Sequence, residues 1–150
     1  KQIRVFLTQH STSYSSETRF ANKVHRWVRE HTQDELNQMV NNKHDIGPVH
    51  TVEAVSRGVS GRVKAVRFIG VSGEVIVERE LRVRRLLNNL RSGLFVVDHL
   101  DDGTWRFTGG GYGHGVGMSQ YGAIGMAERG ASAEKILRHY YSGAKVGSVY

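Results

Sequence analysis

The feature that most constrains this chain is a dense cluster of glycines in its last third. Nine of the 18 glycines lie between Gly103 and Gly125, and within the segment 109–123 glycine alternates with larger residues from position 111 to position 117. Glycine has no Cβ and reaches positive φ without a steric penalty, so this run leaves backbone amides bare and lets a ligand or another segment approach closely. Regular patterning breaks here, and we expect the function of the chain to depend on this segment.

The rest of the composition is that of a soluble globular protein. With 150 residues, of which 39% are hydrophobic, residues 1–150 are expected to form a single domain around one core. No apolar run approaches the roughly 18 residues of a membrane-spanning helix, so the chain is not expected to span a membrane. It has no cysteine, which excludes disulfides and thiolate ligands, and we expect neither a cofactor nor a metal. The formal net charge of +7 favours an anionic partner.

Outside the glycine cluster, the apolar pattern predicts short strands and a few helices. β-branched residues punctuated by Gly and Ser-Gly turns predict three antiparallel strands between positions 49 and 77, and Asp101-Asp102-Gly103 predicts a hairpin turn. We therefore predict an α+β fold, in which a mostly antiparallel sheet packs against helices that follow residues 32, 79, 119 and 132, with Trp27 and Trp105 in the core. Further strands are expected at 24–31, 94–97 and 105–107, and helices at 33–41, 79–90, 119–129 and between Ser132 and Gly143, the last with an apolar side of Ile136, Leu137, Tyr140 and Tyr141.

The order of strand, glycine loop and helix around this cluster first suggests a phosphate-binding loop. The spacing argues against it. No Lys-Ser or Lys-Thr follows the glycines, and the sixth position of each G-x-G-x-x-G frame is His114, Val116 or Met118 instead of glycine. A serine-hydrolase elbow requires G-x-S-x-G, whereas the second residue after Ser119 is Tyr121. His114 could still act as a base for Ser119, but the segment contains no carboxylate that would orient it.

The polar side chains of this loop are the candidate binding residues. His114 and Gln120 supply one imidazole and one amide amid bare backbone, a pattern typical of a pocket wall that hydrogen-bonds sugar hydroxyl and N-acetyl groups. Ser119 has two interpretations, a ligand-binding hydroxyl or only the N-cap of the next helix. A tyrosine ring of the loop can face a pyranose ring. The predicted binding set is Tyr112, Gly113, His114, Gly115, Gly117, Ser119, Gln120 and Tyr121.

Four stretches of the chain resemble the family of stage II sporulation protein D and LytB (SpoIID/LytB). Residues 113–120 resemble the GHGVGMSQ-type loop of that family, and residues 136–143 resemble its Ile-Leu-x-His-Tyr-Tyr-x-Gly stretch. Upstream, residues 57–63 look like its Arg-x-x-Ser-Gly-Arg-Val turn, and residues 90–95 look like its Leu-Arg-Ser-x-x-Phe element. The resemblance covers most of the chain, and the GHGVGMSQ core is highly specific.

This resemblance implies work on the bacterial cell wall, outside the cytoplasm. The sporulation members of the family look like lytic transglycosylases that cleave peptidoglycan glycan strands, preferably after amidases have removed the peptides, and LytB-type members are described as amidase enhancers. Lytic transglycosylation needs one carboxyl group, which protonates the glycosidic oxygen and then takes the proton of the C6 hydroxyl to give a 1,6-anhydro product.

The chain departs from the family pattern at the catalytic residue. The family carries its proposed catalytic Glu in an upstream Glu-Met-Pro stretch, but here no Glu-Met pair exists and Pro48 is the single proline. The chain therefore resembles the C-terminal half of the family domain, and its partners would be the missing N-terminal half or a cell-wall amidase. None of the nearest carboxylates is expected to replace the missing Glu; these are Asp98, Asp101, Asp102 and Glu128.

The function predicted from the sequence is recognition of peptidoglycan glycan strands, as part of a SpoIID-like lytic transglycosylase acting on peptide-stripped cell wall. The alternative is a non-catalytic amidase-enhancer or glycan-binding module. A nucleic-acid-binding interpretation would use an arginine stripe, but Glu78 and Glu80 weaken its field and two adjacent members lie on different helix faces, so no nucleic-acid partner is expected. The stripe consists of Arg79, Arg82, Arg84, Arg85 and Arg91.

Overall fold

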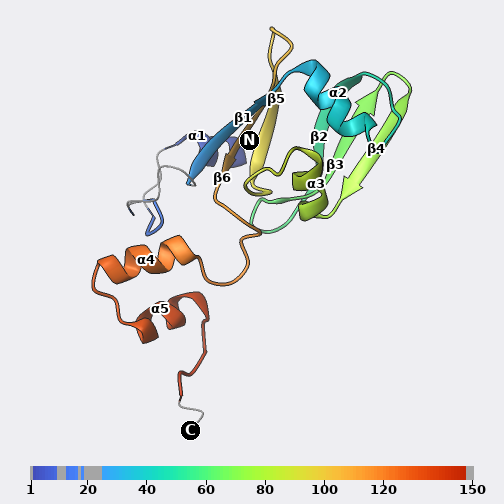
Figure 1. Cartoon of the computed structure of the whole chain (residues 1–150). Helices are drawn as coiled ribbons and strands as arrows, with labels where there is room; N and C mark the ends of the chain where they lie inside the picture. The colour runs from blue at the N-terminus through green and yellow to red at the C-terminus, as the bar shows by residue number, and fades with distance from the viewer. Residues whose placement is uncertain (1, 10–12, 17, 19–24, 148–150) are drawn as a thin grey trace.

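A computed structural model describes residues 2–9, 13–16, 18 and 25–147. Within these ranges the chain forms five helices and six strands (Figure 1). In chain order they are α1 (Gln2–Thr8), β1 (Arg26–His31), α2 (Gln33–Asn41), β2 (Val49–Arg57), β3 (Val63–Gly70), β4 (Gly73–Glu78), α3 (Glu80–Leu86), β5 (Phe95–His99), β6 (Trp105–Gly110), α4 (Gln120–Glu128) and α5 (Ala133–Tyr140).

The strands form two antiparallel sheets of three strands each, ordered β1-β6-β5 and β2-β3-β4. The predicted α+β class is confirmed, as are the three consecutive strands between positions 49 and 77 and the hairpin turn at 101–103. The prediction of one sheet is wrong in detail: after α3 the chain returns to β1, and β5 and β6 complete with it a separate sheet whose central strand is β6. Both sheets contribute to a single core, with Phe68 from one and Phe95, Phe107, Trp27 and Trp105 from the other.

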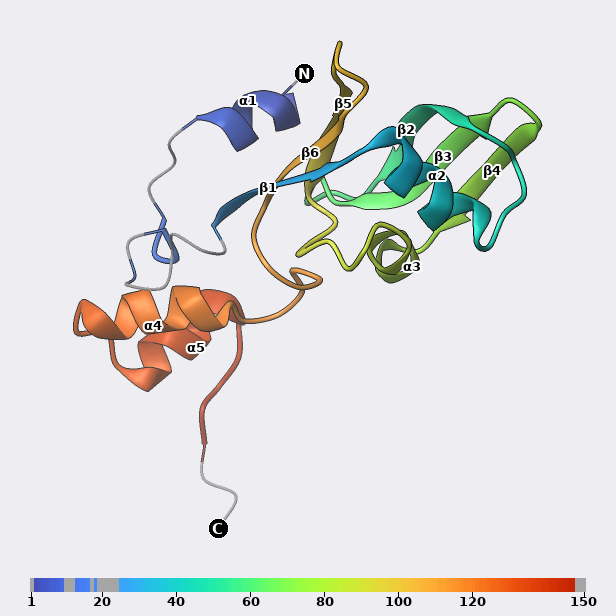
Figure 2. The same cartoon turned by 45° about the horizontal axis from the view of Figure 1, so that its top comes forward.

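Two of the predicted helices cover the sheets and two do not. The helices α2 and α3 pack on strands, whereas α4 and α5 pack on each other and lie below the sheets, joined to them through the glycine loop (Figures 1 and 2). The backbone of Tyr14 lies against Gly125 of α4, and its ring meets His139 of α5 edge-on at 5.6 Å between centroids. The expectation that the helices after residues 119 and 132 pack against the sheet is therefore wrong, because their small apolar faces are covered by each other and by the N-terminal turn.

Local sequence accounts for where the helices begin and end. The capping box of Thr32 and Glu35 is present at the start of α2. The helix predicted for 79–90 ends at Leu86, because Asn88 and Asn89 adopt positive φ of 51° and 57°. Similarly, α5 ends at Tyr140, three residues before Gly143. The helix α1 was not predicted from the sequence, and it buries only Leu7. The first strand begins at Arg26, and the expected start at Val24 lies outside the described residues.

A buried histidine lies at the end of β1. His31 is only 5% exposed, and its ring meets Phe107 edge-on at 5.9 Å between centroids. Its Nε2 has no hydrogen-bond partner among the described residues, and its Nδ1 lies 3.8 Å from the carboxylate of Glu35. Burial lowers the pKa of His31 from its ordinary value of 6.5; the charge of Glu35 opposes this shift and that of Arg29 adds to it. The fold therefore favours the neutral imidazole.

We expect His31 to make the chain less stable in acid. The unfolded chain takes up a proton at His31 near pH 6.5, but the folded chain does so only at lower pH. The stability contributed by neutral His31 is therefore complete above pH 6.5 and is lost as the pH falls towards the folded-state pKa. His31→Phe should show a shallower fall of Tm between about pH 7 and pH 5 than wild type. His50→Phe, at an exposed histidine of β2, should follow the wild-type curve. Parallel curves for wild type and His31→Phe would contradict this role.

Candidate functional site

The glycine loop, residues 111–119, joins β6 to α4 and alternates between two kinds of residue. Its glycines at positions 111, 113, 115 and 117 all have left-handed φ, between 71° and 79°. Side chains with large exposure lie between them, with Tyr112 at 66% and Val116 at 77%. A backbone that turns left-handed at every second residue requires glycine at those positions, because a Cβ is disfavoured there. The alternation read from the sequence is therefore a structural requirement of the loop.

The start of the loop is held rigidly by the segment 90–95. The Ser92 hydroxyl is fully buried and donates to the Gly110 carbonyl at 2.6 Å. The Gly113 N–H donates to the Arg91 carbonyl at 2.8 Å, and the Trp27 indole N–H donates to the Gly111 carbonyl at 3.1 Å. Leu-Arg-Ser, one of the stretches that resembles the SpoIID/LytB family, thus anchors the loop.

The end of the loop is held by α4 and α5. Ser119 is the N-cap of α4, because its Oγ accepts the Gly122 N–H at 3.1 Å. Burial raises the pKa of Tyr140, and its hydrogen bond with Ser119 offsets part of that shift. The Tyr141 hydroxyl accepts the Met118 N–H at 3.3 Å. Tyr141 is 45% exposed, so its predicted place on the apolar side of the helix is wrong: its phenol is directed to the loop.

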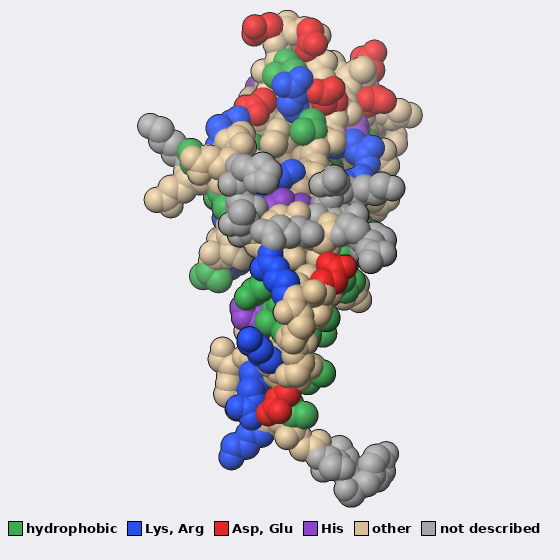
Figure 3. Space-filling model, turned by 90° about the vertical axis from the view of Figure 1, so that its left-hand side faces the viewer, with side chains coloured by type: hydrophobic (Ala, Val, Ile, Leu, Met, Phe, Trp, Pro, Cys, Tyr) green, Lys and Arg blue, Asp and Glu red, His purple; other side chains and the backbone are tan. Residues whose placement is uncertain are grey.

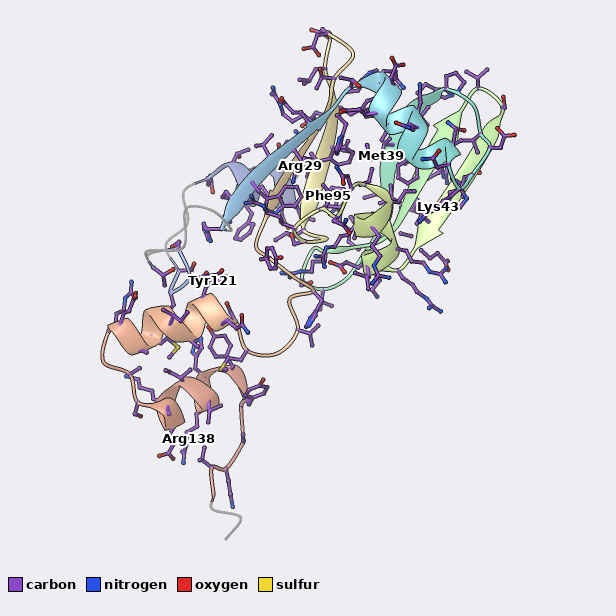
Figure 4. The ribbon with its side chains drawn as sticks, viewed as in Figure 1. Arg29, Met39, Lys43, Phe95, Tyr121 and Arg138 are labelled. Carbon is purple, nitrogen blue, oxygen red and sulfur yellow. The ribbon has the colours of Figure 1, made fainter. Side chains whose placement is uncertain are left out.

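The loop surrounds an open pocket of about 500 Å³. All eight residues of the predicted binding set line it, so the structure brings them together at one place; they are Tyr112, Gly113, His114, Gly115, Gly117, Ser119, Gln120 and Tyr121. Gln120 is the first residue of α4 and not part of the loop itself. Figure 4 shows Tyr121 at the start of α4, on the side that faces the sheets, whereas Arg138 lies on the far side of α5.

His114 has a defined orientation in this pocket. Its Nδ1 accepts the Val116 N–H at 3.0 Å, a bond that requires an unprotonated Nδ1. The neutral ring consequently carries its proton on Nε2, which is a hydrogen-bond donor. The imidazole therefore offers one N–H to a ligand and uses its other nitrogen to shape the loop.

Three residues from outside the glycine-rich segment 109–123 also line the pocket and were not predicted: Ser15, His25 and Arg62. Arg62 belongs to the turn 57–63, whose resemblance to the SpoIID/LytB turn was the available signal. That turn is fixed by Arg57, which donates to the carbonyls of Gly61 and Phe95 at 2.9 and 3.0 Å. Ser15 lies before the first predicted element and His25 lies in the strand expected at 24–31, and nothing in the sequence connects either residue to the loop.

No Asp or Glu is among the described residues that line the pocket. The carboxylates that were considered as replacements for the catalytic Glu lie outside the pocket. Asp98 pairs with Arg4 at 2.8 Å, and Asp102 accepts the Thr104 N–H at 2.9 Å in the hairpin turn. That hydrogen bond lowers the pKa of Asp102, opposite to the shift that a general acid needs. Glu128 is exposed at the end of α4.

Two further properties limit the chemistry of the described residues. No group of three or more His, Asp or Glu side chains among them is arranged to hold a metal ion. None of the helices described is long and apolar enough to cross a membrane. Polar recognition by backbone, imidazole, amide and phenol groups is what the pocket offers.

An α+β chain with this anchored glycine loop is a relative of the SpoIID proteins, as comparison with curated proteins shows. It is 42% identical to stage II sporulation protein D of Bacillus amyloliquefaciens over 76 residues, which cover 51% of this chain and 21% of the relative. It is 46% identical to an amidase enhancer of Bacillus subtilis over 54 residues, 36% of this chain and 8% of the relative. An uncharacterized protein of Brachyspira hyodysenteriae is 32% identical over 126 residues, 83% of this chain and 33% of the relative.

The matched regions thus span a third or less of the length of each of these relatives. A family model also matches most of the chain: the one described as "Domain of unknown function (DUF8618)" matches residues 1–117. The chain belongs to this family. The matched region ends within the glycine loop, before α4 and α5.

Proposed function

We propose that the chain recognises peptidoglycan glycan strands, as the substrate-binding half of a SpoIID-like lytic transglycosylase that acts on peptide-stripped cell wall in the bacterial envelope, outside the cytoplasm. The observation that carries this proposal is the convergence of the whole predicted binding set on one open pocket. The names of its relatives, stage II sporulation protein D and amidase enhancer, support a role at the cell wall.

The chemistry of the pocket suits a sugar polymer. Bare backbone beside the loop glycines gives N–H and C=O groups room to meet hydroxyl and N-acetyl groups. The His114 Nε2–H and the Gln120 amide add side-chain hydrogen bonds, and the ring of Tyr112 or Tyr121 can cover the apolar face of a pyranose. The pocket is open to solvent, as a site that admits an extended strand must be.

A second candidate function, a non-catalytic amidase-enhancer or glycan-binding module, is favoured by the lack of any carboxylate among the described pocket residues. A lytic transglycosylase needs one acid, so in the first proposal a segment outside residues 1–150 supplies it. In the second proposal no acid is needed, and a cell-wall amidase is the partner. The two candidates make the same prediction for binding and opposite predictions for cleavage in a reconstituted protein.

The binding role of His114 is tested by His114→Ala. Loss of the Nε2–H donor and of the Nδ1 bond to Val116 should weaken co-sedimentation with peptide-stripped peptidoglycan by about tenfold, the effect of one to two hydrogen bonds. His50→Ala removes an exposed histidine of β2 that does not line the pocket, and this variant should bind as wild type. The Tm of both variants should remain near that of wild type, because both side chains are exposed. Unchanged binding by a folded His114→Ala variant would remove His114 from the site.

Mass spectrometry of the released material separates the two candidate functions. The chain alone is expected to bind the glycan without producing 1,6-anhydro sugars. Anhydro products that appear only when a polypeptide bearing the Glu-Met-Pro stretch is added would support the transglycosylase. Binding without cleavage in that mixture, together with faster amide cleavage by a cell-wall amidase, would support the enhancer. Anhydro products from the chain alone would show that one of its own carboxylates is catalytic.

A further inference from the structure

Arg62 projects from the turn 57–63 into the pocket and packs against the glycine loop. A Cβ added to Gly115 would overlap the guanidinium group of Arg62, and one added to Gly111 would lie 3.7 Å from its Nη2. The guanidinium therefore occupies the space that these glycines leave beside the backbone. The position of Arg62 is fixed by its own turn, since its carbonyl accepts the Gly58 N–H at 2.8 Å and the next N–H, of Val63, donates to the Gly93 carbonyl.

The guanidinium of Arg62 is held in place without a partner for its charge. Its Nε is buried with no hydrogen-bond partner, and no ion pair joins Arg62 to an acidic group of the described chain. Arg67 also has a buried Nε with no hydrogen-bond partner among the described residues, but its guanidinium pairs with Glu53 at 3.3 Å. Arg57 donates to two carbonyls, and Arg84 donates to Glu80 and to the Leu90 carbonyl. A buried polar group that the fold leaves unpaired is unfavourable unless a ligand completes its hydrogen bonds.

The electrostatic surroundings favour an anion. Arg62, His25 and His114 are the ionisable groups of the pocket apart from tyrosines, and no carboxylate faces them from its described walls. Below the pocket, Lys and Arg side chains gather over α4 and α5 (Figure 3). The formal net charge of the chain is +7. An anionic group entering the pocket therefore meets the positive charge of Arg62 and no carboxylate from the described walls.

We infer that Arg62 binds a carboxylate of the glycan strand, and so makes the pocket selective for strands whose muramic acid lactyl groups carry no peptide. This inference rests on the proposed function and adds to it a specificity-determining residue. Removal of a stem peptide by an amidase converts the lactyl amide into a free carboxylate. A guanidinium pairs with a carboxylate through two parallel N–H···O bonds, whereas an amide offers it one uncharged oxygen. The group that amidase action exposes is thus the one that Arg62 can recognise.

The test compares strands that differ only in this group. Glycan strands are stripped of peptides with an amidase and of phosphate polymers with hydrofluoric acid, and half of the preparation then has its carboxylates converted to methylamides. Co-sedimentation of the full 150-residue chain is measured on both forms. We expect wild type to prefer the carboxylate form by about tenfold, which corresponds to roughly 1.4 kcal/mol. Arg62→Gln should reduce this ratio to about one, and Arg62→Lys should retain part of it, because an ammonium keeps the charge but not the paired geometry.

Arg82→Gln is the matched control. Arg82 is an exposed arginine of α3 outside the pocket, so its loss lowers the net charge equally and should leave the ratio at its wild-type value. Equal binding of both strand forms by wild type, or an unchanged ratio in folded Arg62→Gln, would overturn the role of Arg62 while leaving glycan recognition intact. Binding that depends on Arg62 on untreated wall, is lost after hydrofluoric acid and is equal for the carboxylate and methylamide forms would assign Arg62 to a phosphate polymer and also overturn it. If wild type binds neither form, the proposed function itself fails.

Discussion

Gly115→Ala is expected to weaken binding to peptide-stripped glycan by at least tenfold while the rest of the chain stays folded. Two effects act together at this position. Its φ of 71° is left-handed, which costs about 1–2 kcal/mol for alanine. The new Cβ would also overlap the guanidinium group of Arg62, so the arginine and the loop cannot both keep their positions. The loop therefore changes shape where the proposed ligand binds.

Gly113→Ala separates these two effects. Its φ of 79° carries the same backbone strain, but an added Cβ would have no heavy atom within 4 Å. We expect the two variants to lose similar amounts of thermal stability and only Gly115→Ala to lose most of its affinity. Co-sedimentation with peptide-stripped glycan and Tm, measured on both variants, distinguish the effect of loop strain from that of displacing Arg62. Equal losses of affinity would show that loop strain, and not the position of Arg62, controls binding.

The conformation of the glycine loop was predictable because its pattern is local. Glycines at every second position indicate a backbone with left-handed φ at those positions. A serine at the start of a predicted helix, here Ser119, indicates an N-cap. Strands 49–57, 63–70 and 73–78 were predictable for a similar reason, since tight turns connect them in order. In each case the residues that determine the conformation are close neighbours in the chain.

Features that depend on distant contacts were not predictable in the same way. Nothing near Arg62 in the sequence indicates that it reaches Gly115, more than 50 residues later. The division into two sheets depends on the pairing of β1 with β6. These two strands are separated in the sequence by all three strands of the other sheet, β2 to β4. Tyr141 has the spacing of a core residue, yet its phenol binds the Met118 N–H because α5 packs on α4 and not on a sheet. Periodicity shows that a face is apolar, but not what covers it.

Gly109 belongs to the same glycine-rich segment, but its role is in the core. It lies on β6 directly opposite Trp27 of β1, and an added Cβ would overlap the six-membered ring of the Trp27 indole. Trp27 is 6% exposed and donates to the Gly111 carbonyl, so it has no free space to move into. The glycine thus lets an aromatic ring cover the neighbouring strand, which is a known way to stabilise a glycine within a sheet.

Gly109→Ala is therefore expected to destabilise the chain by about 1–3 kcal/mol through overpacking, a drop in Tm of several degrees. Gly73→Ala is the matched control: this glycine also lies on a strand, and its added Cβ would make only an ordinary contact of 3.9 Å with Ile46. Its Tm should stay within about 2 °C of wild type. In a Trp27→Phe background, which removes the atoms that collide, Gly109→Ala should cost less than it does in wild type. Equal costs in the two backgrounds would mean that the Trp27 ring is not what excludes a side chain at position 109, and that this glycine, like those at 111 to 117, is required by the backbone itself.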